Sequence, residues 1–366
     1  MMKKIKHMDS TESKDLPSPS AKPKKHKTWP KIVWSVLATL LASLIVWVSV
    51  SLGTSNGVMN LVLRNAFAGS QNIEEPAWTG ETYTGLQYAQ DVETDTLDLY
   101  VPTSNKKTPL LIVVHGGGFI ENDSNSRQAT LMYQYFRSEG YSVASINYRL
   151  SPETTYPEPV SDVKAAIRYL RYNADTYGFD TDKFTIFGES AGGYLATMAA
   201  LSDDDEYTSV PFNGEASAGT ISANVSSLID FYGVLDFENY DSDFDELGTP
   251  HWLTSLVGTS DSTTRDDSII TKFLGKKLTS CTASELKEIN PLSRLEGTTK
   301  NLNIYIAHGS VDITVPKLQS MRFYDLAKYA LPNNKVKYVE EKNFKHADDR
   351  FYTHENLASV KEFLED

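Results

Sequence analysis

Cysteine is almost absent from this sequence of 366 residues, which contains only Cys281. A single cysteine excludes an internal disulfide, so a stable domain must depend on its hydrophobic core. The composition allows a large core, because 40% of the residues are hydrophobic. Cys281 lies in a polar stretch without a glycine-rich turn or a histidine beside it. We therefore interpret it as a structural or surface thiol and not as a nucleophile.

Basic residues are far fewer than acidic ones outside the first part of the chain, and the formal net charge is −13. Residues 1–31 contain nine lysines and only three acidic residues, so the charge of the remainder is more negative still. A strongly acidic domain repels polyanions, which argues against nucleic acid as a partner. Residues 1–30 are rich in lysine, serine and proline and lack apolar periodicity, which predicts a disordered basic tail.

Charged residues are absent from residues 32–52, a run of 21 residues with Trp34 and Trp47 towards its ends. At ~1.5 Å per residue, a helix of this length crosses a hydrocarbon core of about 30 Å. The pattern predicts a transmembrane anchor over residues 31–52 that binds the lipid bilayer. The lysines precede the span, so we expect a cytoplasmic N-terminus and an extracytoplasmic domain. The alternative is a cleaved signal peptide and a secreted protein, although the apolar region of such a peptide is usually shorter.

Residues 53–82 are predicted to be a linker, and residues 83–366 a single catalytic domain in which strand-like and helix-like runs alternate. The continuous aliphatic run at residues 110–115 is typical of a buried parallel strand. Further strands are expected over residues 141–148, 183–188, 228–232, 302–307 and 335–340, and helices over residues 128–139, 160–177, 191–201, 316–330 and 353–364. This alternation predicts an α/β fold with a mostly parallel central sheet, helices on both faces, and a ligand site at the carboxyl ends of the strands.

The segment GESAG at residues 188–192 fits the pattern G-x-S-x-G, with Ser190 at its centre. It lies between a predicted strand and a predicted helix, where a sharp turn requires residues without bulk on either side of the serine. The helix N-terminus that follows favours a developing negative charge. Ser190 is therefore the predicted nucleophile. The alternative is a glycine-rich connection in which the serine only caps the helix.

Three successive glycines follow the aliphatic strand, in the segment HGGGF at residues 115–119. Such a loop leaves backbone N–H groups free to bind a substrate oxygen, which is how an oxyanion hole is built. We predict Gly117, Gly118 and Ala191 as the donors, and we expect His115 to hold the loop by hydrogen bonds. The pattern of a phosphate-binding loop is absent.

A serine nucleophile of this kind needs a histidine and an acid, which follow it in the order Ser, Asp, His. Asp312 and His346 each lie just past a predicted strand, at the same sheet edge as Ser190. We predict that His346 takes the proton of Ser190 and that Asp312 fixes the tautomer of His346.

Alternatives exist for both partners of the serine. Asp236 also follows a strand and is a second candidate for the acid. His354 also follows Asp312, but it lies within a predicted helix. His308 precedes Asp312 and is expected to pack at the strand end.

Residues 235–300 are predicted to include a lid or cap, with residues 251–253 (His251, Trp252 and Leu253) lining an acyl pocket. Aspartates at 241, 243 and 245 alternate as in a calcium-binding loop. Glu246 occupies the sixth position, where such a loop needs glycine, and Trp252 the twelfth. We therefore predict a solvated acidic loop and no metal site.

The segments HGGGF, NYRLSPE, GESAGG and HGSVDITVP, followed by a late histidine, resemble the hormone-sensitive-lipase branch of the α/β-hydrolase carboxylesterases. The resemblance covers residues 83–366. It implies hydrolysis of carboxylic esters without a metal or organic cofactor, through the triad and oxyanion donors named above. The sequence departs from the family in its membrane span and in the segment DDRF soon after His346, where many relatives have glycine-rich residues.

The sequence thus predicts a membrane-anchored, extracytoplasmic carboxylesterase that acts on small-molecule esters. Acetylated glycans, hydroxycinnamoyl esters and small lipids all remain candidate substrates. A peptidase or amidase is the alternative within hydrolases, because it uses the same triad. A catalytically inactive binding module at the cell surface is the alternative from another class.

Overall fold

The computed structural model describes residues 77–215, 220–332 and 334–366. The predicted basic tail, the predicted membrane anchor and most of the predicted linker lie outside these residues. Within the described ranges, no helix is long and apolar enough to cross a membrane.

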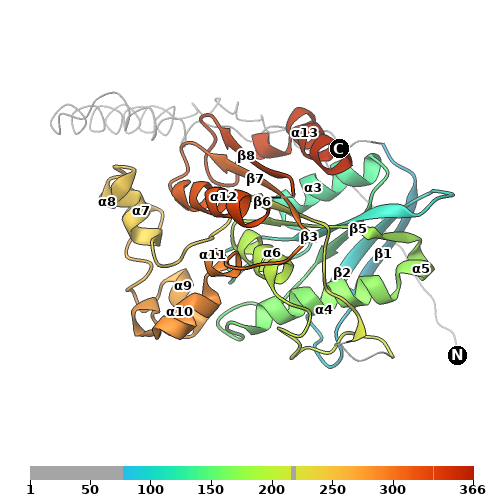
Figure 1. Ribbon diagram of the computed structural model, residues 1–366, viewed down its shortest axis with the longest axis horizontal. Helices are drawn as coiled ribbons and strands as arrows, with labels where there is room; N and C mark the ends of the chain where they lie inside the picture. Colours follow the sequence, from blue (N-terminus) through green and yellow to red (C-terminus); the bar gives the residue numbers. More distant parts are fainter. Residues whose placement is uncertain (1–76, 216–219, 333) are drawn as a thin grey trace, which may run out of the picture. The chain divides into compact units, whose positions relative to one another are not determined.

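An eight-stranded sheet forms the centre of the described domain, with strand order β1-β2-β4-β3-β5-β6-β7-β8 (Figure 1). The strands are β1 (Gly80–Gln87), β2 (Thr96–Pro102), β3 (Thr108–Val114), β4 (Ser142–Ile146), β5 (Phe179–Glu189), β6 (Ser227–Phe231), β7 (Asn303–Gly309) and β8 (Val336–Glu341). The β1–β2 and β2–β4 pairs are antiparallel, and the remaining pairs are parallel. The predicted mostly parallel sheet is therefore confirmed.

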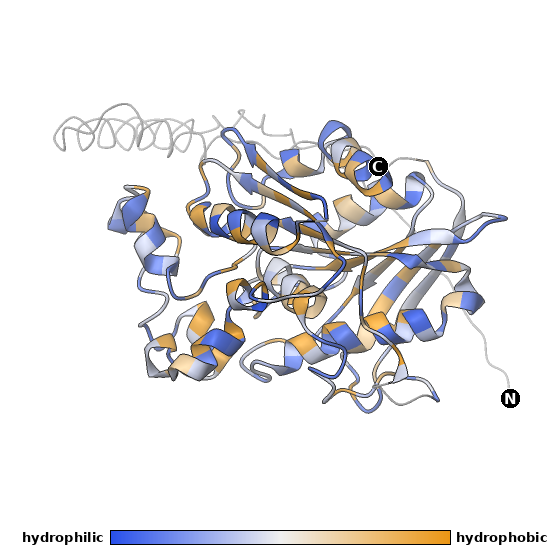
Figure 2. Cartoon of the chain, in the orientation of Figure 1, coloured by the Kyte–Doolittle hydropathy of each residue, from blue (hydrophilic) through white to orange (hydrophobic). Residues whose placement is uncertain are grey.

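Helices cover both faces of the sheet, because alternate residues of each central strand point to opposite sides. On one side, Ile112 of β3 belongs to the same buried cluster as residues of α4 (Glu158–Tyr172), α6 (Ala191–Leu201) and α12 (Leu318–Ala330). On the other side, Leu111 and Val113 pack in a cluster with residues of α3 (Arg127–Ser138) and α13 (His354–Glu365). Figure 2 shows the hydrophobic residues concentrated along the central strands between these layers.

Several element boundaries differ from the predicted ones. The helix expected over residues 160–177 is two helices, because α4 ends at Tyr172 and α5 (Ala174–Tyr177) begins after Asn173. Strand β5 begins at Phe179, before the predicted start at residue 183. Strand β1 begins at Gly80, inside the segment predicted as a linker.

Short helices fill the chain between β6 and β7, where the sequence predicts a cap. They are α7 (Tyr240–Glu246), α8 (His251–Leu256), α9 (Ile269–Leu274), the 3₁₀ turn η2 (Leu278–Ser280), α10 (Ala283–Ile289) and α11 (Pro291–Arg294).

The prediction of a solvated acidic loop around residues 241–246 is wrong, because these residues belong to helix α7. Asp241 accepts hydrogen bonds from the N–H groups of Ser262 (2.8 Å) and Thr263 (3.0 Å), and Asp243 is buried.

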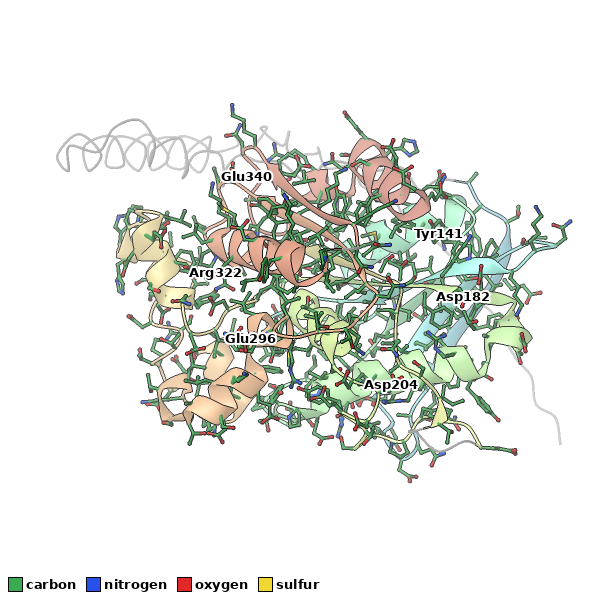
Figure 3. The ribbon with its side chains drawn as sticks, in the orientation of Figure 1. Tyr141, Asp182, Asp204, Glu296, Arg322 and Glu340 are labelled. Atoms are coloured by element: carbon green, nitrogen blue, oxygen red, sulfur yellow. The ribbon has the colours of Figure 1, made fainter. Side chains whose placement is uncertain are left out.

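Arg322 of α12 fastens this segment to the domain (Figure 3). Its guanidinium group forms ion pairs with both Asp236 and Asp243, whose side chains are buried. A distant arginine therefore compensates the buried acidic residues of this segment, of which Asp243 lies in α7.

Replacing Arg322 by methionine is expected to lower the free energy of unfolding by about 3 kcal/mol, because Asp236 and Asp243 then lack their cation in a buried site. Urea denaturation measures this loss. The matched control is Lys317→Met at the N-cap of the same helix, which breaks a partly exposed pair with Glu340 (3.0 Å). That change should stay within about 1 kcal/mol of the wild type. Equal losses in the two variants would contradict the anchoring role.

Candidate active site

Ser190 occupies a sharp turn between the end of β5 and the start of α6, with φ of 55° and ψ of −120°. Two glycines allow this turn. A Cβ atom at Gly188 would collide with the carbonyl oxygen of Gly192, and one at Gly192 would collide with the carbonyl oxygens of Val114 and His115. Only glycine fits at these positions, so the G-x-S-x-G spacing follows from the backbone packing.

The structure brings the three predicted triad residues together from the ends of three strands. The Oγ atom of Ser190 lies 2.9 Å from Nε2 of His346. The Nδ1 atom of His346 lies 2.7 Å from Oδ2 of Asp312. Asp312 follows β7 and His346 follows β8, so neighbouring parallel strands deliver both side chains to the sheet edge that holds Ser190.

Asp312 is a buried carboxylate whose charge is well compensated. Its Oδ1 atom accepts hydrogen bonds from the N–H groups of Thr314 (2.8 Å) and Val315 (2.9 Å). His308 Nε2 lies 3.3 Å from Oδ2. Burial by itself would raise the pKa of Asp312, but His346 and His308 outweigh it and hold this pKa well below its usual range.

These contacts determine the proton positions at His346. Burial lowers the pKa of His346, but the negative charge of Asp312 and its hydrogen bond raise it, and the net effect is a raised pKa. An ionised carboxylate can only accept, so Nδ1 carries the proton that Asp312 binds. In neutral His346, Nε2 is then free to accept the proton of Ser190.

The alternative acid and base lie elsewhere in the domain. Asp236 pairs with Arg322 and also accepts from the side chain of Asn239 at 2.8 Å. His354 begins α13 and packs edge-on against Tyr135. His308 is buried at the strand end as predicted, and its Nδ1 lies 2.7 Å from the Ser320 hydroxyl.

The predicted oxyanion donors line the same cavity as Ser190 and His346. Within the described residues, the N–H groups of Gly117 and Gly118 donate no hydrogen bond, and both glycines have positive φ (112° and 60°). Ala191 is the first residue of α6, so its N–H has no partner inside the helix. Three backbone donors are therefore available beside the serine.

His115 holds the base of the oxyanion loop. Its ring stacks on Tyr148, whose hydroxyl donates to the His115 carbonyl oxygen at 2.9 Å. Burial lowers the pKa of His115 to about 4, so the ring is neutral near pH 7. His115 Nδ1 lies 2.7 Å from the Gly116 carbonyl oxygen, which agrees with the loop-holding role expected from the sequence.

The cavity at Ser190 has a volume of about 280 Å³ and is formed partly by the segment between β6 and β7. The residues of that segment that line it are Val234, Tyr240, Gly258, Thr259, Ser262, Ile269 and Ile270. The predicted acyl pocket at residues 251–253 is wrong, because none of these residues lines the cavity. Trp252 is exposed, Leu253 is buried elsewhere, and His251 contacts Asp261 at 3.1 Å.

Sequence reasoning missed Ile269 and Ile270, although a signal was present. Ser268 is followed directly by apolar residues, a pattern that predicts a helix start, and its side chain caps α9 by accepting from the N–H of Thr271 (3.1 Å). The capped helix α9 then presents Ile269 and Ile270 to the cavity.

Metal binding and a cysteine nucleophile are both less well supported than a reaction at Ser190. Within residues 77–215, 220–332 and 334–366, no group of three or more histidine, cysteine or acidic residues could hold a metal ion. Cys281 is half-buried, and burial raises the pKa of its thiol by more than the nearby Lys276 lowers it, so the thiolate that a nucleophile needs is disfavoured.

Comparison with known proteins places these features in a family. A family model described as BD-FAE matches residues 97–326, which is more than half of the chain. The chain belongs to the BD-FAE family. The BD-FAE domain is part of the hormone-sensitive-lipase-like group of α/β-hydrolase carboxylesterases, so the resemblance seen in the sequence is confirmed.

Named relatives are esterases. The chain is 30% identical to esterase LipQ of Mycobacterium tuberculosis over 244 residues, which are 67% of this chain and 51% of LipQ. It is 26% identical to esterase LipC of the same organism, over 64% of this chain and 52% of LipC. An acetyl esterase of Salmonella schwarzengrund is 33% identical over 36% of this chain and 39% of its own length. The chain thus spans about half the length of the first two relatives.

Solved structures share the fold. A truncated carbohydrate esterase from gut microbiota has a TM-score of 0.63 at 22% identity, covering 80% of this chain and 98% of that one. Esterase B from Lactobacillus Rhamnosis (HN001) has a TM-score of 0.58 at 20% identity, covering 90% of this chain and 93% of that one. The BD-FAE chain therefore has an α/β-hydrolase fold.

Replacing Gly192 by alanine is expected to slow the reaction of Ser190 with a fluorophosphonate probe by at least about tenfold, because the collision with Val114 and His115 displaces the turn. Mass spectrometry of the labelled protein measures the rate. Gly140→Ala is the control, since a Cβ at Gly140 meets nothing within 4 Å and only the positive φ of Gly140 (85°) opposes the change. Equal labelling rates in the two variants would contradict the proposed role of the turn.

Proposed function

We propose that this protein is a serine carboxylesterase that hydrolyses short-chain esters through an acyl-enzyme at Ser190. The observation that carries the proposal is the continuous relay from Asp312 through His346 to Ser190, with contacts of 2.7 and 2.9 Å, beside unpaired backbone N–H groups. The names of the esterase relatives support the same reaction class.

The geometry is suited to two successive acyl transfers. The Ser190 oxygen attacks the ester carbonyl carbon while His346 Nε2 takes the serine proton, and the developing oxyanion binds the N–H groups of Gly117, Gly118 and Ala191. Collapse of this intermediate breaks the bond to the alcohol, which leaves with the proton from His346. Water then repeats the attack on the acyl-enzyme, releasing the acid and restoring Ser190.

The size and lining of the cavity favour small acyl groups. A volume of about 280 Å³ lies near the low end for ligand pockets. Val234, Ile269 and Ile270 supply apolar surface for an acyl chain. The similar proteins include an acetyl esterase and an esterase whose structure was solved with butyrate bound, which agree with a short-chain preference.

A panel of p-nitrophenyl esters tests this proposal. We expect the highest kcat/KM for acetate to butyrate esters and a decline for longer chains. Ser190→Ala should lower kcat by at least about 10⁴-fold with the fold intact, because the nucleophile is lost. Ser104→Ala, at an exposed serine, is the matched control and should behave as wild type.

Two results would point to the alternatives instead. Faster hydrolysis of matched p-nitroanilides than of esters would indicate an amidase or peptidase. A lack of fluorophosphonate adduct on Ser190 in the wild-type protein, together with no ester turnover, would indicate an inactive binding module.

We further propose that residues 32–52 anchor the protein in the cell membrane, with the esterase domain on the extracytoplasmic side. The support is the uncharged run of 21 residues and the lysines that precede it. A secreted form released by cleavage is the alternative.

Extraction of membranes with alkaline carbonate tests the anchor. The full chain is expected to stay in the membrane pellet, and a variant that lacks residues 32–52 should appear in the supernatant, because only the apolar span holds the protein. Protease added outside intact cells should degrade the esterase domain. Release of the full chain by carbonate would contradict the proposal.

A further inference from the structure

Glu189 is a buried carboxylate beside the nucleophile that the triad does not use. It is the last residue of β5, is 3% exposed, and lines the cavity at Ser190. A buried carboxylate is costly unless its oxygen atoms are hydrogen-bonded or its charge is compensated. The interactions that compensate it therefore indicate what it does.

The first interaction joins Glu189 to the oxyanion loop. The N–H of Gly116 donates to Oε1 of Glu189 at 2.7 Å. A Cβ atom at Gly116 would lie 2.5 Å from the same oxygen, so only glycine allows this approach. Gly117 follows directly, and it is one of the predicted oxyanion donors. One side chain thus links the turn that holds Ser190 to the loop that holds the oxyanion.

The second interaction is electrostatic and involves His346. Burial raises the pKa of Glu189, and the Gly116 N–H, the positive form of His346 and the Tyr232 hydroxyl reduce this rise without cancelling it. In return, the negative charge of Glu189 raises the pKa of His346, in addition to the larger effect of Asp312.

Only a small number of polar and aromatic groups among the described residues surround His346 and Glu189. The groups that face His346 are the Asp312 carboxylate at 2.7 Å, the Ser190 hydroxyl at 2.9 Å, the Tyr232 ring at 4.9 Å and the Glu189 carboxylate.

The groups that interact with the charge of Glu189 are the Gly116 N–H, His346, Tyr148, Tyr232 and Tyr352. His308 contacts the Asp312 carboxylate, with Nε2 at 3.3 Å from Oδ2. Among the described residues, Glu189 is thus the second negative charge that stabilises protonated His346.

We propose that Glu189 is a positioning residue with two separable effects: its oxygen holds the oxyanion loop at Gly116, and its charge stabilises the protonated His346 that forms when Ser190 attacks. The proposal rests on the esterase activity proposed above. The two effects can be separated because glutamine retains an acceptor oxygen at this position without the charge, whereas alanine removes both.

In Glu189→Gln, the acid limb of the pH profile of kcat/KM should move to lower pH. Catalysis needs neutral His346, so activity is lost as the pH falls below the pKa of His346. Removing the charge of Glu189 lowers that pKa, and activity then persists to lower pH. The limb should move by up to about one unit, and kcat at neutral pH should fall up to about tenfold because protonated His346 is less stable.

In Glu189→Ala, the same shift should come with a further loss of kcat of at least about tenfold. The loop is then no longer held at Gly116, and losing a single oxyanion donor costs about 10²–10³ in rate. KM should change little in either variant. Glu153→Gln makes the same chemical change at an exposed site and should leave both readouts unchanged.

A titration of the His346 imidazole by NMR supplies a readout that needs no turnover. The pKa of His346 should be lower in Glu189→Gln than in the wild type, while thermal unfolding shows that both are folded. An unchanged His346 pKa, or equal kcat values in Glu189→Gln and Glu189→Ala, would overturn the proposal. Absence of ester hydrolysis by the wild type would instead contradict the proposed function, and the NMR shift would still decide the role of Glu189.

Discussion

The close approach of two backbones at the turn of Ser190 is the constraint on which the rest of the site depends. Gly192 lies against the carbonyl oxygens of Val114 and His115, so the N-terminus of α6 touches the end of β3. Ser190 follows β5, and the glycine loop at residues 116–118 follows β3, its neighbour in the sheet. Because no side chain separates them, the loop donors and the serine oxygen share one cavity.

The central sheet places the other two residues of the site, Asp312 and His346. Asp312 and His346 are far from Ser190 in the sequence, but the parallel register of β7 and β8 brings both to the same edge. Charge compensation then holds them there. The two backbone N–H groups and two histidines around Asp312 keep it ionised although it is buried, and this ionised state sets the tautomer of His346.

The parts of the structure that the sequence predicted are those with local signals. The turn at Ser190 requires glycines at fixed positions, and the buried parallel strands require aliphatic runs, so both can be recognised from adjacent residues. Strand β1 is mostly exposed and has no continuous apolar run, which is why its start was assigned to a linker. Asp243 of α7 is paired with Arg322, which lies 79 residues further along the chain, and no local sequence pattern indicates that contact.

The cavity was the least predictable part for the same reason. His251, Trp252 and Leu253 looked suited to an acyl pocket by residue type, but the short helix α8 turns Trp252 to solvent and buries Leu253 away from Ser190. Which side chains reach the cavity is set by how the segment between β6 and β7 is fastened, and by the cap at Ser268 that starts α9.

The triad residues and the cavity wall come from different parts of the fold, which affects how the sequence of such a protein can change. The proton relay is built on the sheet, whereas much of the cavity wall comes from a segment that adds no strand to it. Residues 235–300 can therefore vary in length and shape while the reacting atoms keep their distances. The range of substrates and the ability to react with them depend on different parts of the chain. Substitutions in residues 235–300 can therefore change the substrate range while the reaction itself is retained.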